Sequence, residues 1–127
     1  MKNISIGLIG MGNIGTGVVK LLRQNEKLIA QRLGAKLVLK KIADINLKSA
    51  RELKLPEAML TLNASEIIED PEISIVIELV GGYEPARTFV LEAIKNGKHV
   101  ITANKAMLAT YGNQIFAQAQ KKAVDVG

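Results

Sequence analysis

The stretch that decides the fold is ISIGLIGMGNIGTG, residues 4–17. An apolar strand is expected over Ile4–Gly10, and it runs directly into glycines 10, 12 and 15, which form the pattern G-x-G-x-x-G. The residues that follow are apolar at helical spacing, which predicts an amphipathic helix over about residues 13–28. A strand, a glycine turn and a helix in this order predict the first β–α unit of a parallel sheet.

Each glycine of the pattern has a separate mechanical task. Gly10 allows a tight turn, Gly12 lets a pyrophosphate approach the backbone, and Gly15 lets the helix pack closely on the strand. Asn13 and Ile14 lie at the start of the helix, where free N–H groups favour phosphates. All five residues are therefore candidate cofactor contacts. The alternative is a glycine turn that binds no ligand.

A second strand is expected over Ala35–Asp44, and Asp44 closes it. An acid at this position binds the ribose hydroxyls of an adenosine, although Asp44 lies farther beyond Gly15 than the usual ~20 residues. The alternative is that Asp44 caps a local turn through Asn46. Its carboxylate would repel a 2′-phosphate, while the nearby basic residues Lys41, Lys48 and Arg51 would attract one. The expected cofactor is NAD or NADP, with a tilt towards NAD.

The rest of the chain continues the alternation of strands and helices. Residues 45–72 form a connecting region with helical pieces near residues 49–53 and 65–70 and a short strand near 60–62. Beyond it we expect a strand over Ile73–Gly82, a helix from Pro85, a strand over His99–Thr102, a helix over about Tyr111–Lys122 and the opening of another strand at VDVG. This order predicts an α/β fold, a doubly wound parallel sheet of Rossmann type, in one domain over residues 1–127.

The ends of the third and fourth long strands carry further candidates. Parallel strands bring their carboxyl ends to one edge of the sheet, so both ends should lie beside the glycine turn. Lys105 is either a ligand contact there or a solvated lysine, and Asn104 either orients a ligand group or caps the next helix. The candidate cofactor contacts at these two ends are Val80, Gly81, Gly82, Thr102, Ala103, Asn104 and Lys105.

Composition excludes several other classes. The chain has no cysteine and one histidine, so we expect neither a disulfide nor a metal site. The net charge is +5, but the lysines are spread among acids without a basic run, so nucleic acid is not an expected partner. No segment approaches the ~20 apolar residues that span a bilayer. A cytoplasmic location is expected.

Four segments, GMGNIGTGVV, IVIELVGGYEPAR, LEAIKNGKHVITANKAMLA and FAQAQKKAVDV, resemble the N-terminal cofactor domain of homoserine dehydrogenases over nearly the whole chain. The resemblance implies an NAD(P)-dependent oxidoreductase that interconverts L-homoserine and L-aspartate 4-semialdehyde, in threonine and methionine biosynthesis. It also implies that Lys105 lies beside the nicotinamide and the substrate and assists hydride and proton transfer. Val80, Gly81 and Gly82 would line the nicotinamide side.

Two departures from that family qualify the prediction. Ile45 stands where many members carry an arginine, which weakens the case for NADP. Members also continue past the position of Val126 into a substrate and dimerisation domain that is absent from this chain. We therefore expect the isolated chain to bind the cofactor without turnover, and to form a homo-oligomer only with that domain. The alternatives are a non-catalytic dinucleotide-binding module and another small-molecule dehydrogenase.

Overall fold

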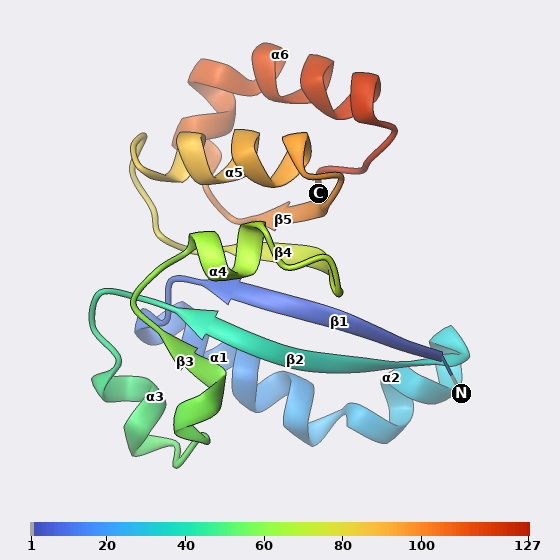
Figure 1. The fold of residues 1–127 in the computed structure, drawn as a ribbon, viewed down its shortest axis with the longest axis vertical. Helices are drawn as coiled ribbons and strands as arrows, with labels where there is room; N and C mark the ends of the chain where they lie inside the picture. Colours follow the sequence, from blue (N-terminus) through green and yellow to red (C-terminus); the bar gives the residue numbers. More distant parts are fainter. Residues whose placement is uncertain (1) are drawn as a thin grey trace.

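Five parallel strands form one sheet in the order β3-β2-β1-β4-β5 (Figure 1). The computed structural model describes residues 2–127. The strands are β1 (Lys2–Ile9), β2 (Ala35–Ala43), β3 (Leu60–Thr61), β4 (Ile73–Glu78) and β5 (His99–Thr102). The chain starts in the middle of the sheet, builds outward to β3 and then crosses to the other side. The predicted doubly wound α/β sheet is confirmed, and the winding reverses between β1 and β4.

Helices cover both faces of this sheet. They are α1 (Gly12–Gln24), α2 (Glu26–Leu33), α3 (Lys48–Glu52), the short 3-10 helix η1 (Glu57–Met59), α4 (Ser65–Ile68), α5 (Ala86–Lys95) and α6 (Lys105–Lys122). One apolar cluster joins α1 and α3 to the sheet, and the other joins α4, α5 and α6 to the opposite face. Because β1 and β4 are covered on both sides, their sequences are nearly continuous apolar runs.

The register of the central strands aligns the residues that end them. Ile9 of β1 lies opposite Glu78 of β4, and Glu78 lies opposite Thr102 of β5. The turns that follow these three strands therefore begin at the same edge of the sheet. All the residues proposed from the sequence as ligand contacts lie at this edge.

Several predicted boundaries were wrong. The first helix ends at Gln24, and α2 follows after Asn25, whose backbone is not helical. The third long strand ends at Glu78 instead of Gly82, because Gly81 and Gly82 have positive φ angles of 81° and 68° that leave the strand conformation. The last helix begins at Lys105 instead of Tyr111.

The early start of α6 has a local cause. The side chain of Asn104 accepts a hydrogen bond from the N–H of Met107 at 3.0 Å, which is the N-cap arrangement. The strand opening expected at VDVG exists as a single parallel bridge between Val126 and Val100.

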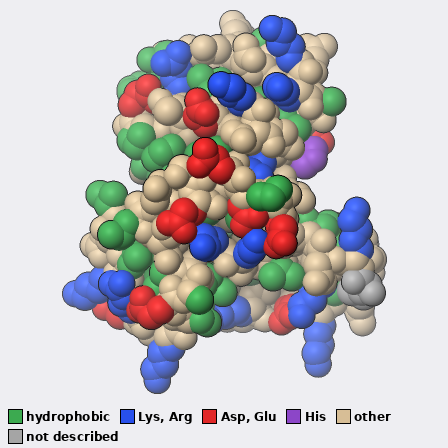
Figure 2. Space-filling model, in the orientation of Figure 1, with side chains coloured by type: hydrophobic (Ala, Val, Ile, Leu, Met, Phe, Trp, Pro, Cys, Tyr) green, Lys and Arg blue, Asp and Glu red, His purple; other side chains and the backbone are tan. Residues whose placement is uncertain are grey.

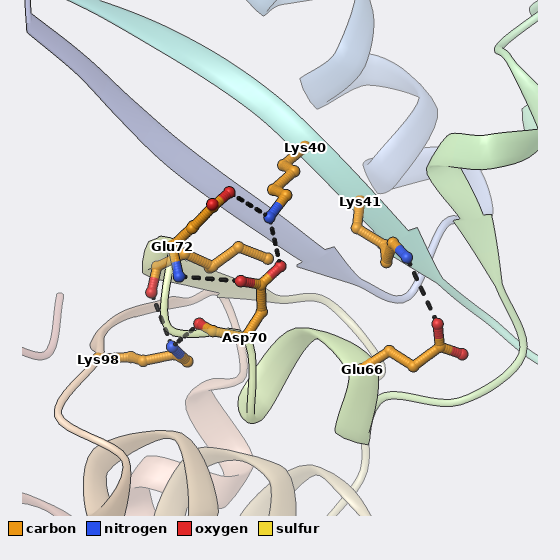
Figure 3. A network of polar contacts seen from close by, with 7 residues as sticks. Lys40, Lys41, Glu66, Asp70, Glu72 and Lys98 are labelled. Atoms are coloured by element: carbon orange, nitrogen blue, oxygen red, sulfur yellow. Dashed lines mark hydrogen bonds and ion pairs between the residues drawn. The ribbon is translucent and has the colours of Figure 1, made fainter.

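The opposite end of the sheet is held by a polar network (Figure 3). The buried Lys98 donates from Nζ to the carbonyl oxygens of Asp70 and Ile73, at 2.6 and 2.7 Å. Lys40 pairs with the carboxylates of Asp70 and Glu72, both at 2.7 Å. Burial lowers the pKa of Lys98, and the hydrogen bond from Lys40 lowers the pKa of Asp70. These bonds fix the turn that leads into β4.

Acidic and basic side chains are interspersed on the face that includes this network (Figure 2). Lys41, which follows Lys40 in β2, pairs with Glu66 of α4 at 3.4 Å. The exposed pairs contribute little to stability individually. The Lys41–Glu66 pair links α4 to β2, and Ile67 and Ile68 anchor α4 in the apolar core.

Candidate functional site

The glycine turn joins β1 to α1 and is closely packed on both sides. A Cβ on Gly10 would lie 2.8 Å from the carbonyl carbon of Leu79, and a Cβ on Gly15 would lie 2.7 Å from the carbonyl oxygen of Gly10. Gly10 has a φ of 98° and donates its N–H to Ala43 at 2.9 Å. Gly10 therefore makes the tight turn, and Gly15 lets α1 pack onto it, which are the mechanical tasks expected of them.

Gly12 differs from these two glycines because it faces open space. No atom lies within 4 Å of a Cβ built on it, and its φ is 30°. It begins α1, whose first turn has no acidic residue and whose N-cap residue, Met11, makes no side-chain cap. The N–H groups of this turn are therefore available to an anion, and the positive end of the helix dipole favours one. A pyrophosphate fits this arrangement.

Asp44 lies beside the same turn, at the end of β2. Its Oδ2 accepts from the N–H of Met11 at 2.5 Å, and its Oδ1 accepts from the N–H of Asn46 at 3.1 Å. The local turn through Asn46, which was the alternative for this residue, is thus present. The same carboxylate also contacts the glycine turn, so the two interpretations do not exclude each other.

Asp44 lines a cavity of about 180 Å³ that is otherwise mostly apolar. The cavity lies at the ends of β1 and β2 and is closed by residues from the later turns. Its other walls include Gly10, Ile45, Leu62, Val80, Pro85 and Phe89. Val80, which the resemblance places on the nicotinamide side, thus lines this cavity and not the second one. Such a cavity, with one carboxylate at its edge, suits an adenosine. Leu62, Pro85 and Phe89 could not be identified as wall residues from the sequence, since their place depends on the strand order.

A second cavity, of about 190 Å³, lies on the other side of the glycine turn. Residues of α1, of the β4 end and of the β5 end line it together. They are Ile14, Glu78, Leu79, Gly81, Ala103, Asn104 and Lys105. Lys105 is exposed, and it stands at this cavity as the first residue of α6. The structure therefore brings Lys105 to the same edge as the glycine turn.

The remaining candidates lie near these cavities without lining them. Asn13 is exposed in the first turn of α1. Thr102 and Gly82 lie behind the second cavity, where the Thr102 hydroxyl donates to Glu78 at 2.6 Å and the Gly82 carbonyl accepts from the Asn104 side chain. Asn104 therefore caps α6 and also ties together the turns after β4 and β5.

Glu78 is the residue that the sequence did not explain. It is fully buried at the end of β4 and accepts from the N–H of Val80 at 2.7 Å and from the hydroxyl of Thr102. A lone carboxylate at the end of an apolar strand was the only signal in the sequence. Its partner Thr102 could be identified only from the register of β4 and β5.

Residues 2–127 hold neither a metal-binding cluster nor a membrane-spanning helix. In that range no group of three or more His, Cys, Asp or Glu side chains is placed to hold a metal ion. Nor does any helix in that range have the length and hydropathy needed to cross a membrane.

The order of the strands and the glycine turn at a helix N-terminus define the class of this protein, a Rossmann-type dinucleotide-binding domain. The family model described as "Homoserine dehydrogenase, NAD binding domain" matches residues 10–127. The chain belongs to this family.

Individual relatives agree with the family match. The chain is 36% identical to a homoserine dehydrogenase from Bacillus subtilis, over 99% of this chain and 29% of that protein. It is 44% identical to one from Methylobacillus glycogenes, over 97% of this chain and 30% of that protein. A crystal structure of a homoserine dehydrogenase from Thiobacillus denitrificans superposes with a TM-score of 0.93 at 48% identity, over 99% of this chain and 29% of that one. The chain thus spans about three tenths of these relatives.

Proposed function

We propose that this domain binds NAD or NADP for an oxidoreductase that interconverts L-homoserine and L-aspartate 4-semialdehyde. The observation that carries the proposal is the pair of cavities on either side of an uncapped glycine turn, with Lys105 at one of them, in a chain of the homoserine dehydrogenase family. In the complete protein the substrate is a small molecule, L-homoserine or L-aspartate 4-semialdehyde. Homo-oligomer formation, on this proposal, depends on residues outside 1–127.

Three parts of the cofactor bind at three different places in the site. The N–H groups at Gly12 and Asn13 hold the pyrophosphate, and Asp44 with the first cavity holds the adenosine. Gly81 with the second cavity holds the nicotinamide end, and Lys105 stands beside it. A bound nicotinamide supplies an acceptor or donor of hydride at this end.

Lys105 is the candidate catalytic residue because it is the cation that lines the second cavity. At the reacting end of the site its amine contacts one substrate oxygen, which is the hydroxyl oxygen in homoserine and the aldehyde oxygen in the semialdehyde. It exchanges the proton of that oxygen as the neighbouring carbon loses or gains hydride. The start of α6 and the Asn104 cap hold the backbone of Lys105 in place.

The surroundings of Asp44 favour NAD over NADP. Two of the three basic residues near it are already paired with acids, Lys41 with Glu66 at 3.4 Å and Arg51 with Glu57 at 2.9 Å. Ile45 lines the first cavity and is 91% exposed, so it offers no charge to a 2′-phosphate. Only a modest preference is expected, since Lys48 is near in sequence and surface pairs are easily rearranged.

Residues 1–127 alone are proposed to bind the cofactor without oxidising homoserine. The only ionisable side chains that line the second cavity are Lys105 and Glu78, and Glu78 is occupied by backbone and hydroxyl donors. Orientation of the substrate can lower the activation barrier by ~7 to 11 kcal/mol, and a lysine without orienting groups loses much of this reduction.

The test is a titration of this chain with NADH, followed by nicotinamide fluorescence and by calorimetry. The chain contains no tryptophan, so the fluorescence of the nicotinamide can be read directly. Saturable binding with one NADH per chain is expected. The second measurement is reduction of NAD in the presence of L-homoserine, which should stay at background. Absence of NADH and NADPH binding would contradict the proposed function, and rapid homoserine-dependent reduction would contradict the expected lack of turnover.

A further inference from the structure

The feature that the proposed function leaves unexplained is the buried carboxylate of Glu78. Glu78 and Lys98 are the two charged residues buried within the described part of the chain, and Lys98 lies at the far end of the sheet. The ion pairs found in residues 2–127 involve other carboxylates. A buried carboxylate without a paired cation costs stability unless hydrogen bonds compensate it. Its hydrogen-bond partners therefore indicate its role.

These partners lie in the turn after β4 and at the end of the neighbouring strand β5. Oε2 accepts from the N–H of Val80 at 2.7 Å and, more weakly, from the N–H of Gly81 at 3.4 Å. Oε1 accepts from the Thr102 hydroxyl at 2.6 Å. One carboxylate thus joins the turn after β4 to the end of β5.

Further bonds close these contacts into a ring. The oxygen of the Thr102 hydroxyl accepts from the N–H of Asn104 at 3.1 Å. The Asn104 side chain donates to the Gly82 carbonyl and accepts from Met107, so it returns to the turn that Glu78 holds. Lys105 follows directly on the chain. The ring therefore sets the distance between Gly81 on one wall of the second cavity and Lys105 on the other.

An apolar residue at position 78 would fit the strand but not the ring. It would leave the N–H of Val80 and the hydroxyl of Thr102, both in part-buried hydrogen bonds, without this acceptor. Gly81 and Gly82 have positive φ angles, and a Cβ built on either would meet no atom within 4 Å. The hydrogen bonds to Glu78 and Asn104 tie this turn to the end of β4 and to the start of α6.

We propose that Glu78 is a positioning residue for the nicotinamide end of the cofactor, because it holds the Val80–Gly82 turn and the Thr102–Lys105 turn at a fixed separation. This inference rests on the proposed cofactor function. Glu78 itself does not react. Its effect on nicotinamide binding passes through Gly81, and it also sets the position of Lys105. Because Val80 also lines the first cavity, a smaller effect is expected there.

The experiment compares two ligands that differ only at that end. NADH carries a nicotinamide, whereas ADP-ribose has the same adenosine and pyrophosphate without it. Glu78→Gln keeps the size of the side chain but replaces one oxygen by a donor. Thr102→Val keeps the shape of threonine but removes the hydroxyl. For both variants we expect NADH affinity to fall by about tenfold or more, and ADP-ribose affinity to stay within about twofold.

Two further variants separate this role from a general structural one. Thr102→Ser restores the hydroxyl and should return the ratio of the two affinities to near the wild-type ratio. Glu92→Gln removes an exposed carboxylate of α5 and should leave both affinities unchanged. Amide hydrogen exchange gives a readout without ligand: exchange of the Val80 and Asn104 N–H groups should accelerate in Glu78→Gln, while that of the Gly10 N–H should not.

The outcomes are distinguishable. An unchanged ratio of NADH to ADP-ribose affinity in Glu78→Gln and Thr102→Val would overturn the role of Glu78 and leave the cofactor function standing. Equal weakening of both ligands, with unfolding at lower temperature, would also overturn it, since the residue would then be structural only. A wild-type chain that binds neither ligand would contradict the cofactor function and, with it, this inference.

Discussion

Substitution of Gly12 by alanine separates the fold from the ligand site more sharply than any other single change. The added methyl group meets no protein atom within 4 Å, so it has no packing cost. The φ of 30° is in the left-handed region, where an L-residue costs roughly 1 to 2 kcal/mol. Part of this is offset by about 0.4 to 1 kcal/mol, because alanine lowers the entropy of the unfolded chain. The free energy of unfolding should therefore fall by only about 1 kcal/mol.

The effect on binding should be larger, because the methyl group occupies the space through which a pyrophosphate would approach the backbone. We expect NADH affinity to fall at least tenfold, which is about 1.4 kcal/mol. NADH binding is followed by nicotinamide fluorescence, and stability by urea unfolding with circular dichroism. Both measurements are made on the same preparation.

Two other glycines of α1 provide matched controls. Gly17 is exposed, has no atom within 4 Å of a Cβ and has no positive φ, so Gly17→Ala should stabilise the helix by about 0.5 to 1 kcal/mol and leave NADH affinity unchanged. Gly15→Ala would place a Cβ 2.7 Å from the Gly10 carbonyl oxygen, so the backbone must shift, at a cost of about 1 to 3 kcal/mol. If Gly12→Ala bound NADH as tightly as Gly17→Ala, the assignment of the glycine turn to the pyrophosphate would be refuted.

Three further predictions concern single side chains. Lys105→Ala should leave the NADH affinity of this chain within about twofold. In a full-length protein with the same substitution, turnover should fall by about a hundredfold or more, because Lys105 acts on the reacting atoms. An equal loss of NADH affinity and turnover would instead point to a binding role. NADH should bind more tightly than NADPH by no more than about tenfold, and Asp44→Asn should shift this ratio towards NADPH; a tenfold preference of the wild type for NADPH would show that the basic residues dominate. The pKa of Asp70 is held below its ordinary value of 3.8, chiefly by the Lys40 hydrogen bond. The ionised carboxylate therefore stabilises the fold at pH values above 3.8, and this stabilisation disappears as the pH falls through the folded-state pKa. The stability difference between wild type and Asp70→Asn should therefore be constant near neutral pH and shrink in acid, as measured by urea unfolding at a series of pH values; a constant difference at all pH values would mean that the pair with Lys40 contributes nothing.

Local signals explain which parts of the site the sequence could predict. The glycine turn needs specific residues at fixed spacing, and the strand before it and the helix after it confirm its context. Asp44 follows β2 directly and Lys105 lies three residues beyond the end of β5, so the rule that parallel strands end at one edge was enough to bring them together. Asn104 was proposed from the sequence as a possible helix cap, which the structure confirms, but the long last helix was expected to begin only at about Tyr111; the Asn104 side chain also donates to Gly82.

Glu78 shows what local signals cannot supply. Its contact with Val80 is two residues away and could be proposed from the sequence, but its contact with Thr102 spans 24 residues. That second contact depends on β4 and β5 being neighbours in a particular register. Before the register is known, a carboxylate in an apolar strand looks like a contradiction. With the register it becomes the link between the two turns.

Asp44 shows how two interpretations of one residue can both hold. A carboxylate has two oxygens, and each can accept more than one hydrogen bond. One oxygen orders the turn at Asn46 and the other contacts Met11 in the glycine turn, and each keeps capacity for a ribose hydroxyl. A substitution at Asp44 will therefore change stability and cofactor affinity together. For this reason the ratio of NADH to NADPH affinity is the informative quantity: the loss of the turn affects both cofactors equally, whereas the loss of charge does not.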